Sequence, residues 1–110
     1  ADFGLMRAAV DAAAAQRIDL RVAGVFSTDC FHGGDPELVA RLLAHRILGV
    51  EMESAGLYGV AMREGFRALS VLTVSDHLQH AAHMPPTQRE QGLARMTALV
   101  LDSLLPAAMG

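Results

Sequence analysis

Along this chain, segments in which apolar residues recur at helical spacing alternate with short, continuous apolar runs. Residues 3–16 place apolar side chains three and four positions apart, which is the helical period, and Asp2 before them is a suitable N-cap. Similar patterns with start or stop signals predict three further helices, over residues 37–45, 55–64 and 87–105. Between the helices, short apolar runs predict strands, over residues 21–27, 46–50 and 67–74.

Local signals support the element ends. Asp35 and Pro36 suit the cap and the first position of the second helix, and Gly65 suits the left-handed end of the third. Residues 87–90 read Thr-Gln-Arg-Glu, a capping box for the last helix. The nearly continuous apolar run over 67–74 favours a strand buried on both faces of a parallel sheet.

The order of the elements predicts the fold class. Helices and strands alternate from the first helix to the last, which indicates an α/β protein with a mostly parallel sheet covered by helices on both faces. We therefore expect a three-layer α/β/α arrangement. A chain of 110 residues is long enough for a single domain, over residues 1–110.

Composition narrows the classes of function. The net charge is −3, and the nine basic residues, all arginine, form no cluster, so binding to nucleic acid is not expected. No apolar run approaches the roughly 18 residues of a membrane helix, and no membrane partner is expected. The single Cys30 rules out an intramolecular disulfide and fits a cytoplasmic protein.

Candidate chemistry follows the ends of the three strands. A loop with Phe31 follows the first strand, Glu51 and Glu53 follow the second, and Asp76 follows the third. In a parallel sheet these ends share one edge, where α/β proteins bind their ligands. Structural alternatives stay open: either glutamate can cap a helix, Asp76 can pair with Arg89, and Phe31 can be a core residue.

Other sites are not indicated. His77, His80 and His83 recur every third residue, but their loop contains proline and offers no ligand set of the zinc type, so no metal is expected. The sequence has no P-loop and no G-x-G-x-x-G, and Gly33-Gly34 alone is too weak to indicate a phosphate cradle.

Several motifs together resemble a known family. They are Ala-Val-Asp-Ala-Ala (9–13), Phe-Ser-x-Asp-x-Phe (26–31), Gly-Val-Glu-Met-Glu-x-Ala-Gly (49–56), Tyr-Gly-Val-Ala (58–61), Thr-Val-Ser-Asp-His (73–77) and Arg89. With them the chain resembles the C-terminal half of hexameric-type bacterial purine nucleoside phosphorylases. Glu-Met-Glu is shared with uridine phosphorylases and with related nucleosidases, whereas Ser-Asp-His points to a purine base.

The resemblance implies a set of substrate-binding residues: Phe31, Val50, Glu51, Met52, Glu53 and Ser75. Glu53 would accept hydrogen bonds from the ribose 2′- and 3′-hydroxyls, and Met52 would pack against the sugar. Phe31 and Val50 would line the base. The same resemblance implies a phosphorylase/hydrolase-like fold, of which this chain carries the C-terminal portion.

The resemblance also implies the catalytic residues, Asp76 and Arg89. Asp76 would protonate N7 of the purine with the assistance of Arg89, which makes the base a better leaving group. Inorganic phosphate would then attack C1′ as the co-substrate, and no cofactor is expected. The products would be the free base and ribose 1-phosphate or its deoxy form, from both 6-oxo and 6-amino purine nucleosides.

Two other functions remain open from the sequence alone. In the family, the N-terminal half supplies the phosphate loop, the phosphate-binding arginines and residues lent to a neighbouring subunit of the hexamer. The 110 residues of this chain do not include them. The chain could therefore belong to an N-ribosyl hydrolase of the same superfamily, or serve as a non-catalytic module for nucleoside binding or assembly. From the resemblance, an assembly of identical subunits is expected.

Overall fold

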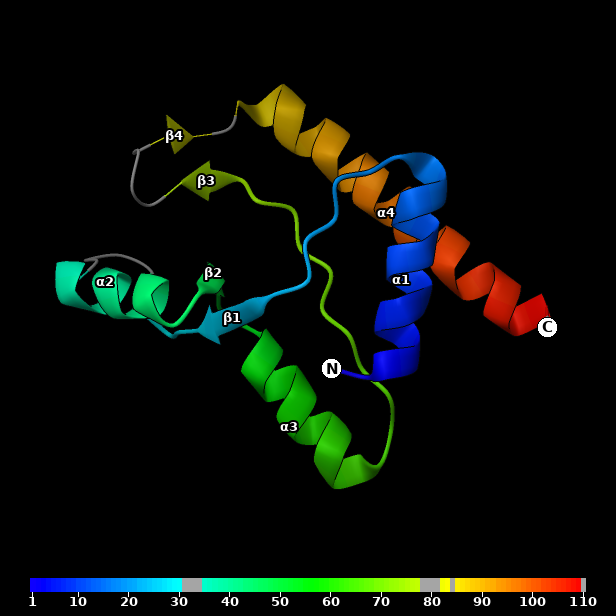
Figure 1. Cartoon of the computed structure of the whole chain (residues 1–110), viewed down its shortest axis with the longest axis horizontal. Coiled ribbons are helices and arrows are strands. Elements are labelled where there is room, and N and C mark those ends of the chain that lie inside the picture. The colour runs from blue at the N-terminus through cyan, green and yellow to red at the C-terminus, as the bar shows by residue number, and fades with distance from the viewer. Residues whose placement is uncertain (31–34, 78–81, 84, 110) are drawn as a thin grey trace. The chain divides into compact units, whose positions relative to one another are not determined.

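The computed structural model describes residues 1–30, 35–77, 82–83 and 85–109, and its side chains are described over 1–30, 35–75 and 85–104. The chain divides into two compact units, Arg21–Ala68 on the one hand and Ala1–Leu20 with Leu69–Gly110 on the other. Helices accompany a small parallel sheet, which confirms the α/β class (Figure 1). The three-layer arrangement and the single domain concern both units together and stay predictions.

The unit over Arg21–Ala68 is built on two parallel strands, β1 (Gly24–Ser27) and β2 (Ile47–Glu51). Helix α2 (Pro36–Ala44) connects them and contacts β2, as expected of a crossover between parallel strands. Helix α3 (Ser54–Glu64) follows β2 and contacts β1. Three predicted elements of this unit are thus confirmed with small shifts of their ends, whereas the first strand begins three residues later than predicted.

The register of the two strands depends on small residues. A Cβ atom at Gly24 would lie 2.9 Å from Ile47 Cδ1, and one at Gly49 would lie 3.2 Å from Val25 Cγ1. Gly24 pairs with Ile47 and Val25 with Gly49, so the ladder is irregular between Gly24 and Val25. Beyond this irregularity the last strand residues, Ser27 and Glu51, lie opposite each other.

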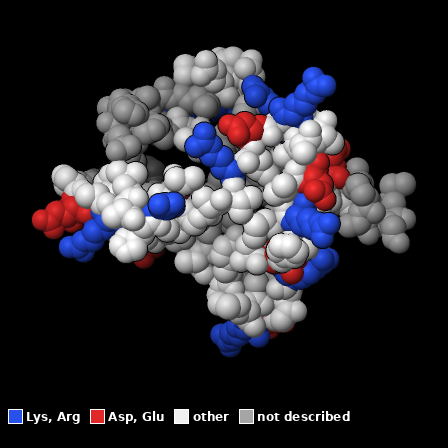
Figure 2. All heavy atoms as spheres, in the orientation of Figure 1, with Lys and Arg blue, Asp and Glu red and all other residues white. Residues whose placement is uncertain are grey.

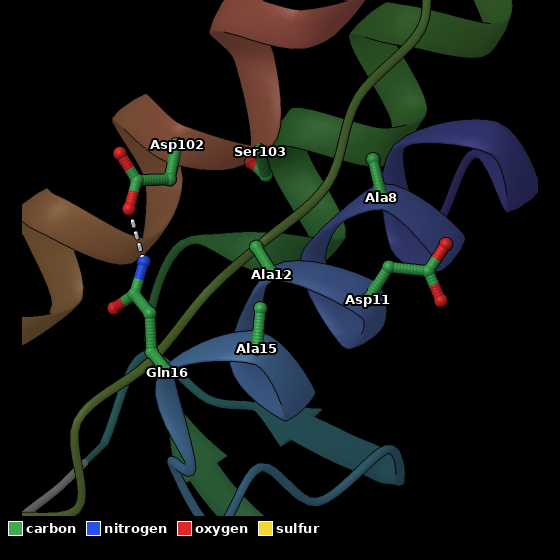
Figure 3. A pocket seen from close by; sticks show the side chains of 7 residues that line it. All are labelled: Ala8, Asp11, Ala12, Ala15, Gln16, Asp102 and Ser103. Carbon is green, nitrogen blue, oxygen red and sulfur yellow. Dashed lines mark hydrogen bonds between the residues drawn. The ribbon is translucent and has the colours of Figure 1, made fainter.

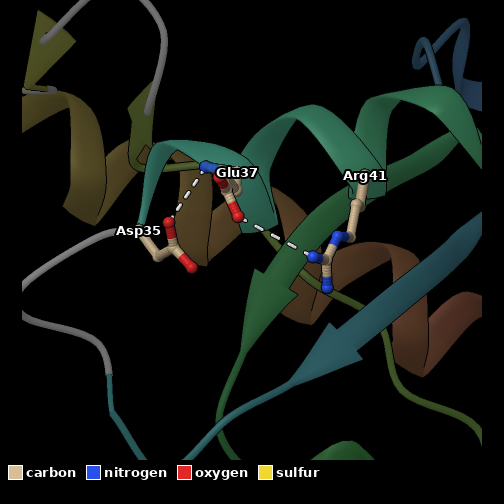
Figure 4. Close-up of polar contacts among 3 residues, drawn as sticks. All are labelled: Asp35, Glu37 and Arg41. Carbon is tan, nitrogen blue, oxygen red and sulfur yellow. Dashed lines mark hydrogen bonds and ion pairs between the residues drawn. The ribbon is translucent and has the colours of Figure 1, made fainter.

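The predicted ends of α2 and α3 are confirmed. The Asp35 side chain accepts a hydrogen bond of 3.0 Å from the Glu37 backbone N–H, with Pro36 in the first turn (Figure 4). Glu37 also pairs with Arg41 at 3.8 Å, but both side chains are exposed, so this ion pair contributes little. Gly65 ends α3 with a φ of 76°, the left-handed conformation that favours glycine.

The other unit is organised by helices α1 (Phe3–Gln16) and α4 (Pro86–Met109), which pack together. Ala9 and Ala13 of α1 and Leu99 of α4 are buried. The Asp2 side chain accepts a hydrogen bond of 2.8 Å from the Leu5 N–H, which confirms the predicted N-cap of α1.

Two predictions for residues 67–90 are wrong. No strand forms over 67–74; instead the two-residue strands β3 (Asp76–His77) and β4 (Ala82–His83) pair antiparallel just beyond it. An apolar run becomes a strand only beside another strand, and here Thr73 lies against α4, its hydroxyl 3.5 Å from the Gly92 carbonyl oxygen. The capping box is also wrong, because α4 begins at Pro86 and the Arg89 N–H already donates to the Pro85 carbonyl at 3.0 Å.

Much apolar surface stays exposed in the described part of the chain. Phe3, Met62 and Val74 are 72%, 81% and 68% exposed, and the buried apolar side chains are four alanines and Leu99. Arginine and acidic side chains are interspersed over the face shown in Figure 2, with uncharged areas between them. None of the described helices is both long and apolar enough to cross a membrane.

Candidate functional site

The carboxyl ends of β1 and β2 meet at one edge of the parallel pair. Ser27 is the register partner of Glu51, and the Thr28 N–H donates to the Glu51 carbonyl oxygen at 2.9 Å, which extends the ladder by one residue. Residues 52 and 53 then form a bend that leads into α3. The Glu-Met-Glu motif therefore lies where the sequence predicts it, between the end of a strand and the start of a helix.

The Glu51 carboxylate is bound to the start of α3. Its Oε2 accepts hydrogen bonds of 2.7 Å from the backbone N–H groups of both Glu53 and Ser54. Its Oε1 accepts a hydrogen bond from the Ser27 hydroxyl. Backbone donors at a helix start have no partner within the helix, so Glu51 satisfies groups that would otherwise be left unpaired.

Ser27 completes this arrangement. The Ala55 N–H donates to Ser27 Oγ at 2.9 Å, so Ser27 and Glu51 together accept from three successive backbone N–H groups, those of residues 53–55. These donors are therefore already bound within the chain and are not available to an anion such as phosphate. The helix-cap alternative considered for either glutamate thus holds for Glu51.

The electrostatics of Glu51 follow from these contacts. Burial raises the pKa of its carboxyl, but hydrogen bonds from Ser27, from the backbone of Glu53 and Ser54, and from the Ser54 side chain lower it more strongly. The resulting pKa is about 2, below the ordinary value of 4.5. Glu51 is therefore ionised at neutral pH and is unsuited to donate a proton.

Glu53 differs from Glu51 in its exposure and in its hydrogen bonds. It occupies the N-cap position of α3, yet its side chain makes no capping hydrogen bond, and the residue is exposed. Among the described residues, no partner of its carboxylate is found. Met52, 45% exposed, precedes it, and Val50 is half-buried in β2 opposite Phe26.

The predicted site residues fall into two groups, one in each unit. Val50, Glu51, Met52 and Glu53 lie at the end of β2 and the start of α3. In the other unit, Ser75 is exposed directly before β3, Asp76 lies in β3 with its backbone paired to His83, and Arg89 is exposed in the first turns of α4. Phe31 and His80 lie outside the described residues, as do the side chains of Asp76, His77 and His83.

A groove elsewhere in the structure involves none of these residues. It has a volume of about 400 Å³ and lies between α1 and α4, where Ala8, Ala12 and Ala15 line it together with polar residues (Figure 3). The Gln16 side chain donates a hydrogen bond to the Asp102 carboxylate at its edge. Within the described residues, no group of histidine, cysteine or acidic side chains could hold a metal ion.

The role of Ser27 is not predicted from the sequence. The residue lies inside the Phe-Ser-x-Asp-x-Phe motif, but its partner Glu51 is 24 positions away. A signal exists in the sequence, because two parallel strands that end in a serine and in a glutamate can bring these side chains together. The register needed to use that signal is known only from the structure.

Comparison with known proteins identifies the family. Residues 1–105 match the sequence model of the phosphorylase superfamily. The chain belongs to this superfamily. Proteins described as purine nucleoside phosphorylase DeoD-type are 44% identical in Xenorhabdus nematophila and 43% identical in Pectobacterium atrosepticum, and one described as DeoD-type 1 is 42% identical in Vibrio parahaemolyticus. Each similarity runs over 105 residues, 96% of this chain.

The same comparisons show how much of a phosphorylase these residues represent. The chain spans 44% of the length of each of these three relatives. Its superfamily membership therefore applies to nearly all of the 110 residues, whereas the relatives contain a larger part that has no counterpart among them.

Proposed function

We propose that this chain carries the nucleoside-binding part of a purine nucleoside phosphorylase. Its identity of 44% to a DeoD-type purine nucleoside phosphorylase, over 96% of the chain, is the observation that carries the proposal. The proposed reaction is phosphorolysis of purine ribonucleosides and 2′-deoxyribonucleosides to the free base and ribose 1-phosphate or deoxyribose 1-phosphate. Inorganic phosphate is the co-substrate, and no cofactor takes part.

Glu53 is the proposed ligand of the ribose. A carboxylate accepts hydrogen bonds from two neighbouring hydroxyls through its two oxygens, which suits the 2′- and 3′-hydroxyls of a ribose. The exposure of Glu53 and the lack of a capping hydrogen bond from its side chain support this role. Met52, also exposed, supplies an apolar surface beside it for the sugar, and Val50 and Phe31 are proposed to line the base.

Asp76 is the proposed general acid, with Arg89 as its assistant. The bond between C1′ and N9 breaks with its electron pair moving to the purine, while a phosphate oxygen forms the new bond to C1′. A proton delivered from Asp76 to N7 neutralises the departing base, and a positioned general acid contributes about 10²–10⁴-fold to such a step. Ser75, directly before Asp76, is proposed as a further substrate contact, and so is Glu51.

The setting of the reaction is part of the proposal. We place the protein in the cytoplasm and in purine salvage, as an assembly of identical subunits. The exposed apolar side chains of both units support association, because surfaces of this kind are usually covered in an assembled protein.

Product analysis tests the proposal. The full polypeptide that contains these residues is incubated with inosine or adenosine, with and without phosphate, and the sugar products are identified by chromatography. The proposal predicts ribose 1-phosphate, formed only when phosphate is present. Free ribose formed in both conditions would instead show an N-ribosyl hydrolase, and calorimetric binding of inosine without cleavage would show a non-catalytic nucleoside-binding module.

A further inference from the structure

Ser27 occupies a junction between β1, β2 and α3. Its hydroxyl donates to Glu51 and accepts from the Ala55 N–H, so one side chain joins the ends of both strands to the first turn of the helix. Ser27 is half-buried and is not among the residues proposed to contact substrate.

The hydrogen-bond directions at Ser27 are fixed by its partners. A backbone N–H can only donate, so Ser27 Oγ must accept from Ala55. The single hydroxyl hydrogen is then left for the Glu51 carboxylate, which can only accept when ionised. The hydroxyl therefore has one consistent orientation, and a hydrogen bond to an ionised group is among the stronger ones in proteins.

The same hydrogen bonds also fix the backbone at Glu53. The other Glu51 oxygen holds the backbone N–H groups of Glu53 and Ser54 at 2.7 Å each. Ser27 thus fixes the Glu51 carboxylate by a hydrogen bond, and this carboxylate in turn fixes the backbone of Glu53. Ser27 also holds Ala55, two residues further along, so the short segment that carries Glu53 is anchored from both sides.

We propose that Ser27 is a positioning residue, which sets the direction of the Glu53 carboxylate through Glu51 and the first turn of α3. This inference rests on the proposed function, because it assigns to Glu53 the binding of the ribose. Ser27 itself touches neither sugar nor base. Its effect is therefore specific: it concerns the ribose half of a nucleoside and leaves the affinity for a free purine base unchanged.

The test compares Ser27→Ala and Ser27→Thr in the full polypeptide. Calorimetry gives the Kd values for inosine and for hypoxanthine, and steady-state kinetics give KM and kcat for inosine. Because Ser27 acts on the ribose only through Glu51 and Glu53, Ser27→Ala should lose no more than the worth of one ordinary hydrogen bond. This predicts about a 2- to 10-fold rise in the Kd and KM for inosine and a smaller fall in kcat. The Kd for hypoxanthine should stay unchanged. Ser27→Thr keeps a hydroxyl and should restore the inosine values.

Two further variants make the comparison specific. Ser103→Ala removes a hydroxyl that donates only to the Val100 carbonyl in its own helix, so the inosine values should not change. Ser27→Cys, close in size but a weaker hydrogen-bonding partner, replaces Ser27→Ala if the alanine variant fails to fold, and should give an intermediate rise in KM.

The outcomes separate the two claims. An unchanged inosine Kd in Ser27→Ala, or a parallel loss of inosine and hypoxanthine affinity, overturns the positioning role while the proposed function stands. A threonine variant as impaired as the alanine variant overturns it as well. If the unmodified protein binds no purine nucleoside, the proposed function fails, and the positioning role fails with it.

Discussion

The Ser27 hydroxyl donates a hydrogen bond to the Glu51 carboxylate, and the two residues are register partners at the ends of adjacent parallel strands. The two acids of the Glu-Met-Glu motif therefore have different surroundings. Glu51 is ionised and bound to the backbone at the start of α3, whereas Glu53 remains exposed, with no capping hydrogen bond from its side chain. Glu51 thus stabilises the start of α3, whereas both carboxylate oxygens of Glu53 are available to a ligand.

The stability of the protein should depend on the ionisation of Glu51. Its pKa is lowered from 4.5 to about 2 in the folded state, so the stabilisation it provides is complete above pH 4.5 and is lost as the pH falls towards 2. Glu51→Gln should lower the free energy of unfolding by about 1–3 kcal/mol at pH 7. Urea unfolding at several pH values should show this difference shrinking between pH 4.5 and 2.

A matched variant shows how much the free energy of unfolding changes when the charge of another glutamate is removed. Glu37→Gln alters an acid whose ion pair with Arg41 is exposed, so it should change the free energy of unfolding by less than about 1 kcal/mol at pH 7. A Glu51→Gln difference that stays the same from pH 7 to pH 2.5 would contradict the role assigned to Glu51.

The proposed proton donor makes a separate kinetic prediction. Asp76→Asn in the full polypeptide should reduce kcat for inosine by about 10²–10⁴-fold, because protonation of N7 belongs to the transition state. KM should change little, because the ground-state contacts with the sugar are retained. Steady-state kinetics at saturating phosphate measure both constants, and a change confined to KM would exclude Asp76 as the acid.

Helix α3 offers a matched pair of glycines for a test of the fold. Gly59 lies within the helix, and a Cβ atom there meets nothing within 4 Å, so Gly59→Ala should raise the free energy of unfolding by about 0.5–1 kcal/mol. Gly65 ends the helix at a φ of 76°, so Gly65→Ala should lower it by about 1 kcal/mol. Effects of the same sign in urea unfolding would contradict the left-handed helix end at Gly65.

Local signals made part of the fold predictable from the sequence. The caps at Asp2 and Asp35 and the helix end at Gly65 depend on residues within one helical turn, and the structure has all three. A capping motif can still mislead: the Thr-Gln-Arg-Glu sequence at 87–90 fits a box, but Pro86 is already in the helix.

Strands and side-chain contacts that depend on residues far away in the sequence are not predictable from local signals. The run over 67–74 has the composition of a buried strand, yet Thr73 lies against α4 and no strand pairs with the run in the described part of the chain. The sequence leaves the cap role of Glu51 as one of two alternatives, and the hydrogen bonds from the Glu53 and Ser54 N–H groups show it in the structure. Glu53 was predicted from the motif, and its exposure is consistent with that prediction without testing it.

The division of roles between the two acids also makes Glu53→Ala informative. Because the Glu53 side chain makes no capping hydrogen bond, its removal should leave α3 and the stability of the protein nearly unchanged. Glu64→Ala, at the other end of the same helix, removes an exposed side chain whose ion pair with Arg63 is exposed as well, and it serves as the control.

The measurement that tests this account most directly is calorimetric titration of unmodified protein and Glu53→Ala with inosine and with hypoxanthine. Inosine should bind at least about tenfold more weakly to Glu53→Ala, as expected for the loss of hydrogen bonds to a charged group. Hypoxanthine should bind both proteins equally. An unchanged affinity for inosine, or an equal loss for inosine and hypoxanthine, would contradict the assignment of Glu53 to the ribose.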